Sequence, residues 1–190
     1  SAVTADQVVV DAGGTLTQSN NLTLADGTGD DLTVNGVWNW GNGHLIGTGV
    51  SVIENIGTLN INGGGTRFMT SANITNNGTL DWQDGRLDFT GGNSILTNNA
   101  TIIISGNNTT AFNGARLTLT NNGIITKTGT GTSNVTGILL FSNAGTLNCN
   151  GGNFILGDAN AGGTFTNTGS LILNNSTFSI GPGCNYNHNS

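Results

Sequence analysis

The most constraining feature of the sequence is a short phrase, Asn-x-Gly-Thr-Leu-x-hydrophobic, that recurs eight times. The clearest copies span residues 55–61, 76–82 and 143–149. Its glycine position falls at residues 14, 36, 57, 78, 100 (here Ala), 123, 145 and 169, so the steps are 21 to 24 residues. A period near 22 is typical of stacked repeat proteins, in which each unit buries its apolar face against its neighbours.

One period of the sequence reads as three short strands joined by corners. In residues 57–78, segments 57–61, 66–70 and 71–75 have strand character, and the glycine-rich segment 62–65 supplies the positive φ angles that corners need. The sequence therefore predicts an all-β parallel β-helix (β-solenoid) of about eight coils, each of about 22 residues with three short strands, and no significant helix. Eight coils at about 4.8 Å each give a rod about 38 Å long.

We expect a single β-solenoid domain over residues 1–190. Residues 1–13 read as an N-terminal strand or cap, residues 14–183 as the repeat coils, and residues 184–190 as an irregular C-terminal tail that contains His188.

Aligning the copies predicts which side chains stack inside the coil. The first inward rank contains only apolar residues, among them Leu59, Leu80 and Leu147; its full membership is Leu16, Trp38, Leu59, Leu80, Ile102, Ile125, Leu147 and Leu171. The second rank is Gln18, Trp40, Ile61, Trp82, Ile104, Lys127, Cys149 and Leu173. Because a buried unpaired lysine is costly, we expect either a register slip near Lys127 or a corner that opens to solvent there.

Asparagines recur in phase with the glycines. The members of this rank are Asn55, Asn76, Asn98, Asn121, Asn143 and Asn167. Asparagine is a good turn residue, but regular spacing favours a ladder of side-chain amides that bond from one coil to the next.

The composition limits the classes of function. Gly, Asn and Thr contribute 32, 31 and 29 of the 190 residues, and charged residues are 7%. Apolar residues in phase with the repeat and a single proline oppose disorder. The net charge is −6, and four scattered Lys and Arg residues cannot form a phosphate-binding stripe, so we expect no nucleic-acid partner. No apolar run is long enough to span a bilayer, so we expect no membrane insertion.

Catalysis requires titratable groups that converge, and the sequence offers few candidates. His44 and His188 are far apart in the sequence, and the densest charged stretch is residues 81–88. Asp81, Arg86 and Asp88 are expected to point outward there, with Asn60 and Arg67 on the coil below. Parallel β-helix polysaccharide lyases use such an outer face, but we favour a solvated charged patch. We therefore expect no catalytic residues, no enzyme activity and no cofactor.

Two segments have a ligand-binding interpretation and a structural one. Asp26, Asp30 and Asp31 lie among glycines and are candidate calcium ligands, with an acidic turn as the alternative. Trp38, Trp40 and Trp82 could form a platform for sugars, but their inward ranks favour core packing.

Cysteine and threonine leave further alternatives open. Cys149 and Cys184 either form a disulfide that holds the last coils or are two buried small residues. An outward threonine rank raises ice binding as a hypothesis. It includes Thr15, Thr58, Thr79, Thr101 and Thr146, but only Thr15-x-Thr17 places two threonines side by side along one strand.

Residues 8–16 (Val-Val-Val-Asp-Ala-Gly-Gly-Thr-Leu) and 76–80 (Asn-Asn-Gly-Thr-Leu) resemble the repeats of bacterial surface β-solenoid proteins. These include adhesins, autotransporter passenger domains and secreted repeat proteins of the bacterial envelope. The resemblance covers nearly the whole chain and implies an extracellular or cell-surface protein with a structural or adhesive role. A sequence that begins at Ser1 without Met or a signal peptide fits a processed, secreted chain.

Our leading hypothesis is a secreted structural protein that assembles end to end with itself into an extracellular filament or matrix. The strand edges of the two end coils would be templates for a head-to-tail contact, and such contacts produce filaments when they do not close. The alternative is a carbohydrate-binding or adhesive module that recognises surface glycans. An ice-binding protein and a polysaccharide lyase are further alternatives.

Overall fold

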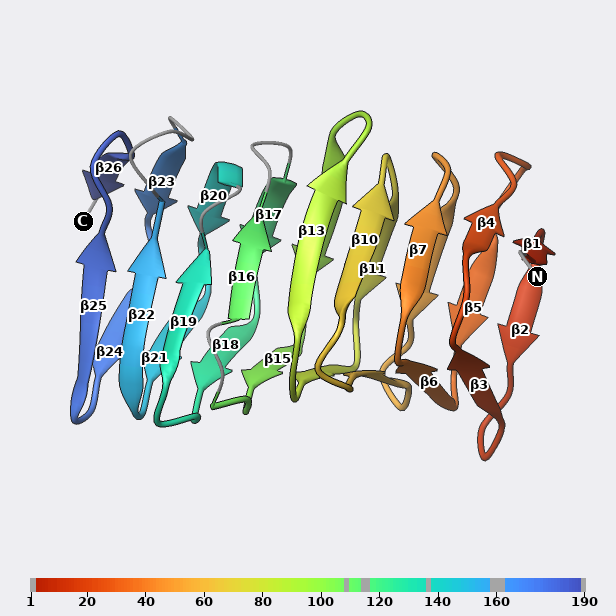
Figure 1. Cartoon of the computed structure of the whole chain (residues 1–190), viewed down its shortest axis with the longest axis horizontal. Helices are drawn as coiled ribbons and strands as arrows, with labels where there is room; N and C mark the ends of the chain where they lie inside the picture. Colours follow the sequence, from red (N-terminus) through yellow and green to blue (C-terminus); the bar gives the residue numbers. More distant parts are fainter. Residues whose placement is uncertain (1–2, 108–109, 114–116, 136–137, 158–162, 189–190) are drawn as a thin grey trace.

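The computed structural model describes residues 3–107, 110–113, 117–135, 138–157 and 163–188. Over these residues the chain is an all-β parallel β-solenoid of about eight turns with three sheets and no helix, which confirms the predicted fold class. The turns are arranged along one axis, with the N-terminus at one end of the rod and the C-terminus at the other (Figure 1).

The chain visits the three sheets, A, B and C, in the same order in every turn, and neighbouring strands within a sheet are parallel. Sheet A contains β1 (Val3–Ala5), β4 (Leu22–Leu24), β7 (Gly43–Ile46), β10 (Thr66–Thr70), β13 (Arg86–Thr90), β16 (Thr110–Asn113), β19 (Thr132–Val135), β22 (Gly152–Leu156) and β25 (Ser176–Ile180). Sheet B contains β2 (Val8–Val10), β5 (Leu32–Val34), β8 (Val50–Ile53), β11 (Asn73–Asn76), β14 (Ser94–Asn98), β17 (Leu117–Asn121), β20 (Ile138–Asn143), β23 (Thr164–Asn167) and β26 (Asn185–His188). Sheet C contains β3 (Thr15–Gln18), β6 (Val37–Trp40), β9 (Thr58–Ile61), β12 (Thr79–Trp82), β15 (Thr101–Ile104), β18 (Ile124–Lys127), β21 (Thr146–Cys149) and β24 (Ser170–Leu173).

The register of sheet C is the register that the repeat predicts. Leu59 pairs with Leu80 and Trp38, and the series continues without a shift from Leu16 to Leu171. Leu59, Leu80 and Leu147 are all buried in the core. The second predicted rank is also continuous from Gln18 to Leu173, so there is no register slip at Lys127.

The phased glycine is required by the closeness of successive turns. A Cβ atom built on Gly57 would lie 2.0 Å from the carbonyl oxygen of Val34, and one on Gly145 would lie 2.0 Å from that of Gly123. Both distances are far shorter than any real contact, so a side chain would push two turns apart. Neither glycine has a positive φ angle. The repeated glycine therefore serves the stacking of backbone on backbone, whereas Gly63 (φ 81°) serves a corner.

An asparagine ladder runs inside the corner between sheets B and C, as predicted. Each rung is the last residue of a sheet B strand, and its Nδ2 donates to Oδ1 of the asparagine one turn on. The distances are 2.7 Å from Asn76 to Asn98, and 2.6 Å for each of the steps to Asn121, Asn143 and Asn167. All five side chains are buried, so the ladder satisfies amides that would otherwise be costly to bury.

The same amides hold the corner itself. Nδ2 of Asn121 also donates to the carbonyl of Gly123 at 3.4 Å and to that of Thr146, in the next turn, at 3.2 Å. Asn98 and Asn143 make the equivalent pairs of contacts. The spacing of Asn and Gly in the repeated phrase thus follows from one side chain that bonds the backbone two residues later.

The ladder prediction was wrong at Asn55, which is exposed in a turn. Ile53 occupies the ladder position in that turn, because it pairs with Asn76. Four residues separate β8 from β9, whereas two separate β11 from β12. The longer corner, closed by a bond from Gly57 N to Glu54 O at 2.8 Å, carries Asn55 out of the core although its glycine stays in register.

Both ends of the described chain are strands of the stack. β1 and β2 pair with β4 and β5, so residues 3–10 form the first strands of sheets A and B. At the other end, where an irregular tail was expected, residues 185–188 form β26 and pair with β23. His188 Nδ1 lies 3.3 Å from Asn167 Nδ2, which places the imidazole at the end of the asparagine ladder.

The ladder predicts that two adjacent asparagines, Asn121 and Asn122, contribute very different amounts to the free energy of unfolding. Asn121→Ala removes the Oδ1 that accepts from Asn98 and the Nδ2 that donates to Asn143, so we expect a loss of roughly 2–4 kcal/mol in the free energy of unfolding. Asn122→Ala is the matched control, because the Asn122 side chain is exposed and its described hydrogen bond goes from Nδ2 to Oδ1 of Asn99, which is also exposed, at 3.0 Å. We expect a loss below about 0.5 kcal/mol for it. Urea unfolding followed by circular dichroism measures both; equal losses would contradict a buried ladder.

Candidate functional site

The most unusual polar site is the corner between sheets C and A, where Arg67 of β10 is fully buried. Its guanidinium donates to five backbone carbonyls. Nε bonds the carbonyl of Trp40 at 2.9 Å, and the two terminal nitrogens bond those of Gly41 (3.1 Å), Gly63, Gly65 (3.0 Å) and Asp84 (3.2 Å). Arginine carries five N–H donors, so one side chain here satisfies the carbonyls of three successive corners.

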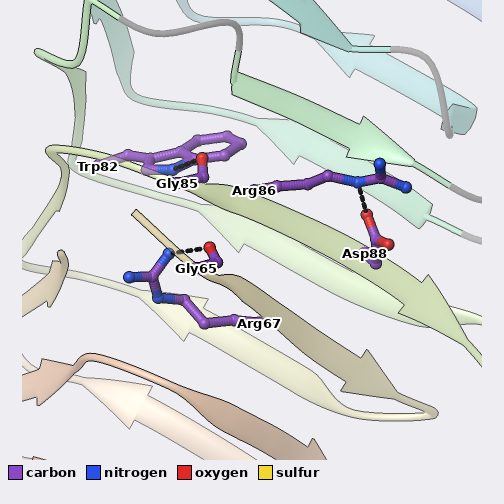
Figure 2. A network of polar contacts seen from close by, with 6 residues as sticks. All are labelled: Gly65, Arg67, Trp82, Gly85, Arg86 and Asp88. Carbon is purple, nitrogen blue, oxygen red and sulfur yellow. Dashed lines mark hydrogen bonds and ion pairs between the residues drawn. The ribbon is translucent and has the colours of Figure 1, made fainter. Parts of the chain in front are cut away.

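Glycines make room for the guanidinium. Gly85 has a φ angle of 80°, and a Cβ atom built on it would lie 2.2 Å from Nη1 of Arg67. Burial lowers the pKa of Arg67 below its ordinary value, and the charge of Asp84 opposes that effect. Figure 2 shows Arg67 turned toward Gly65, with the bond from Trp82 to the carbonyl of Gly85 (3.2 Å) on the next turn.

The prediction that Arg67 lies on the outer face was wrong. Strand β10 alternates, and Arg67 has the same parity as the buried Met69, whereas Phe68 between them points outward. Two sequence signals could have predicted this burial: Arg67 lies two residues before the apolar Met69, on the same side of the strand, and it follows a run of three glycines.

The charged groups of residues 81–88 do not form one cluster. Arg86 Nε pairs with Asp88 Oδ1 at 2.5 Å on the outer face of sheet A (Figure 2). Asp81 lies on sheet C, where its carboxylate accepts from Gln83 Nε2 at 2.9 Å and from Ser105 Oγ at 2.8 Å. A corner therefore separates Asp81 from the ion pair, and Arg67 is buried, so these residues do not converge at one point of the outer face.

Lys127 is a second buried cation at the corner between sheets C and A. Its ammonium donates to the carbonyl of Gly129, and burial lowers its pKa, which the neighbouring Cys149 opposes. Both expectations for Lys127 were wrong, since the strand keeps its register and the side chain is fully buried.

The two cysteines are free thiols, so the disulfide alternative is wrong. Cys149 ends β21, before β22, while Cys184 packs against Gly157, just after β22. A five-residue strand spans about 16 Å, which is beyond the reach of a disulfide. Burial raises the pKa of the Cys149 thiol to about 11, so it behaves as a small apolar core residue.

The candidate calcium ligands do not come together. Asp26 and Asp30 are exposed in the segment between β4 and β5. Asp31 is buried, and its Oδ2 accepts a hydrogen bond from Val50 N at 2.8 Å. Among the described residues, no three His, Cys, Asp or Glu side chains are arranged to hold a metal ion. The acidic-turn alternative describes this segment better.

Aromatic side chains contribute mainly to the core. Trp38, Trp40 and Trp82 are buried as predicted from their inward ranks. On the outer face of sheet A, His44 stacks on Phe68 with ring centroids 4.3 Å apart. Each ring covers one face of the other, so this pair is a weak platform for a sugar. Recognition of glycans and of ice stays a prediction.

The two ends of the rod expose groups that are buried everywhere else in the stack. In the described chain, β1, β2 and β3 have a sheet neighbour on one side only, and so do β24, β25 and β26. Val8 belongs to an inward rank of sheet B and is exposed, because β2 is the first described strand of that sheet. Tyr186, at the other end of the same rank, is exposed too.

Comparisons with protein-family models, with curated proteins and with solved structures found no match. The described residues contain no helix long and apolar enough to cross a membrane.

Replacing Arg67 should lower the stability of the fold far more than replacing Arg86 on the next strand of sheet A. Arg67→Met leaves the carbonyls of Gly41, Gly63 and Asp84 without the donor described for them, and takes one of two donors from those of Trp40 and Gly65. We expect the free energy of unfolding to fall by about 3 kcal/mol. Arg86→Met, the control, breaks an ion pair whose arginine is well exposed, so we expect a change below about 1 kcal/mol. Thermal unfolding of the two variants tests this; comparable losses would show that the buried contacts of Arg67 contribute little.

Lys127 predicts a pH-dependent stability. The pKa of Lys127 is lower in the folded chain than its ordinary value of about 10.4. At pH values between the two, the unfolded chain binds more protons than the folded chain. Lys127 therefore makes the free energy of unfolding rise with pH. Lys127→Met removes the buried ammonium, so we expect it to be more stable than the wild type at pH 7, by an amount that shrinks as pH approaches 10.

Urea unfolding of both chains from pH 7 to 10 measures this difference. All chains in this experiment carry Cys149→Ala, because the charges of Lys127 and Cys149 interact and the thiol, whose pKa is raised to about 11, would titrate differently with and without Lys127. Ile104→Met, one turn earlier in the same rank, is the control, because its free energy of unfolding should differ from that of the parent Cys149→Ala chain by the same amount at every pH. A constant difference for Lys127→Met would contradict a titrating buried amine.

Proposed function

We propose that this chain is the unit of a structural filament that grows by head-to-tail pairing of its end strands, in an extracellular setting. The observation that carries the proposal is that each end presents open parallel strands together with the uncovered end of an inward apolar rank. A second copy offers the matching strands, because the chain pairs like positions with like positions throughout.

The inward rank of sheet B shows how the junction would continue the core. It contains, in order, Val8, Leu32, Ser51, Ile74, Leu96, Leu119, Phe141, Phe165 and Tyr186. Tyr186 stacks on Phe165 with centroids 5.2 Å apart and belongs to the last described strand of its sheet. In a head-to-tail stack, Val8 of the next copy takes that place.

Charge favours a head-to-tail contact over a head-to-head one. The first turns carry Asp6, Asp11 and the aspartates of residues 26–31, whereas residues 163–188 contain no Asp, Glu, Lys or Arg. Two N-terminal ends would therefore repel each other, while an N-terminal end meets no like charge on a C-terminal end. Such a heterologous contact does not close on itself and yields a filament.

The order of the sheets defines the junction further. The described chain begins in sheet A and finishes in sheet B, and sheet C has eight described strands where sheets A and B have nine. Continuing sheets A and B into a second copy therefore leaves a space of one strand in sheet C, between β24 and the β3 of the next copy. A cavity of about 280 Å³ at the N-terminal end, lined by Val3, Leu16, Gln18 and Leu22 among others, lies beside β3. Sheets A and B would thus carry the backbone pairing.

Electron microscopy of the purified chain, with sedimentation velocity, tests this proposal. We expect filaments from the unchanged chain and their loss in Val8→Lys and in Tyr186→Glu, because each places a charge in the junction. Mixing the two variants should restore filaments, since the new charges meet head to tail. Ile124→Lys is the control, because Ile124 is 47% exposed, like Tyr186 at 42%, but lies on the side of the rod. Monodisperse short rods from the unchanged chain at high concentration would refute the proposal.

A further inference from the structure

The described strands of sheet B carry no charged residue on their outer face. The carboxylate of Asp31, directly before β5, lies beside them and is buried, with Oδ2 accepting from Val50 N at 2.8 Å. The nine described strands of sheet B contain no Asp, Glu, Lys or Arg, whereas the outer faces of sheets A and C carry Arg86, Asp88 and Asp81. In a chain of net charge −6, this face is the surface on which two copies could meet with the least repulsion.

Two outward ranks cover this face. The first rank is Val50, Asn73, Ile95, Thr118, Leu140, Thr164 and Asn185. The second is Val9, Thr33, Val52, Thr75, Thr97, Thr120, Ser142, Thr166 and Asn187, in which hydroxyl-bearing side chains predominate and Val52 is buried. Short hydroxyl and branched aliphatic side chains on a regular sheet are the composition of tightly packed sheet-on-sheet contacts.

The first rank alternates large and small side chains. Ile95 and Leu140 are 42% and 38% exposed, and the smaller Thr118 lies between them, with Asn73 before and Thr164 after. Consider a two-fold axis that lies in the plane of contact, parallel to the strands and midway between β14 and β17. Rotation about this axis places a second copy face to face with the first, with its turns in the reverse order. It brings Ile95 opposite Thr118 and Leu140 opposite Asn73, so each large side chain faces a small one.

We infer that the outer face of sheet B is a second self-association surface, on which two copies pack face to face with antiparallel axes. Nine strands about 4.8 Å apart and about 13 Å wide bury about 550 Å² per copy, which is below the roughly 800 Å² per partner of a standard stable interface. The contact is weak between single copies and becomes strong when many copies are joined, because the contacts of a filament act together. This inference rests on the proposed filament and states how filaments pair.

The experiment compares filament width and length by electron microscopy for the unchanged chain, Leu140→Lys and Ile124→Lys. We expect paired filaments from the unchanged chain and single filaments of unchanged length from Leu140→Lys, which places an ammonium in the uncharged contact. Ile124→Lys adds the same charge to sheet C and should leave the pairing intact. Circular dichroism and the unfolding midpoint verify that each variant is folded.

The possible failures are distinguishable. Single filaments from the unchanged chain overturn the lateral contact and leave the end-to-end proposal standing; the face would then be open to another flat, uncharged surface. Paired filaments that persist in Leu140→Lys place the lateral contact elsewhere and also overturn the inference. A chain that forms no filaments overturns both proposals.

Discussion

The structure depends on parallel backbone pairing between the same position of successive turns. Because neighbours along the axis are separated by only about 4.8 Å, each side chain packs mainly against its own counterparts. Apolar residues then form continuous ranks, amides form a ladder, and like charges would face each other at an unfavourable distance. The low charge content, 7% of residues, follows from this constraint. So does the phased glycine, because a Cβ atom on Gly57 or Gly145 would lie 2.0 Å from a carbonyl oxygen of the turn below.

The same constraint explains which parts of the fold could be predicted from the sequence. The strands of sheet C follow the phased glycine directly, so aligning the glycines gave the register from Leu16 to Leu171 correctly. The ladder lies on the other side of a corner, and corners vary in length without disturbing the strands that they join. At Asn55 two additional corner residues break the relation between sequence spacing and position. The spacing of residues in the sequence does not reveal the longer corner, because the glycine remains in phase.

The buried cations could not be predicted for a different reason. A charge is ordinarily placed on the surface because water solvates it better than a protein interior does. At Arg67 the corners supply five carbonyls, and these replace water around the guanidinium. That environment is assembled from residues 40–41, 63–65 and 84, so no local pattern announces it. Lys127 lies at the same kind of corner with one described carbonyl partner, which makes it the less well compensated of the two.

Stability and assembly are linked in such a molecule. Successive turns are held together by backbone hydrogen bonds between their strands and by packing along the inward ranks. An end-to-end contact between copies would use the same two interactions. A junction therefore needs no specialised binding surface, but it does need ordered end strands. At the C-terminal end this order rests on Tyr186 stacked on Phe165 and on the contact of His188 with the last amide of the ladder. Because the ladder transmits order through buried amides from Asn76 to Asn167, a weakened rung in the middle of the rod also lowers the fraction of chains whose last strands are formed. Assembly is then expected to respond to core substitutions far from either end, in proportion to how much they fray the final turn.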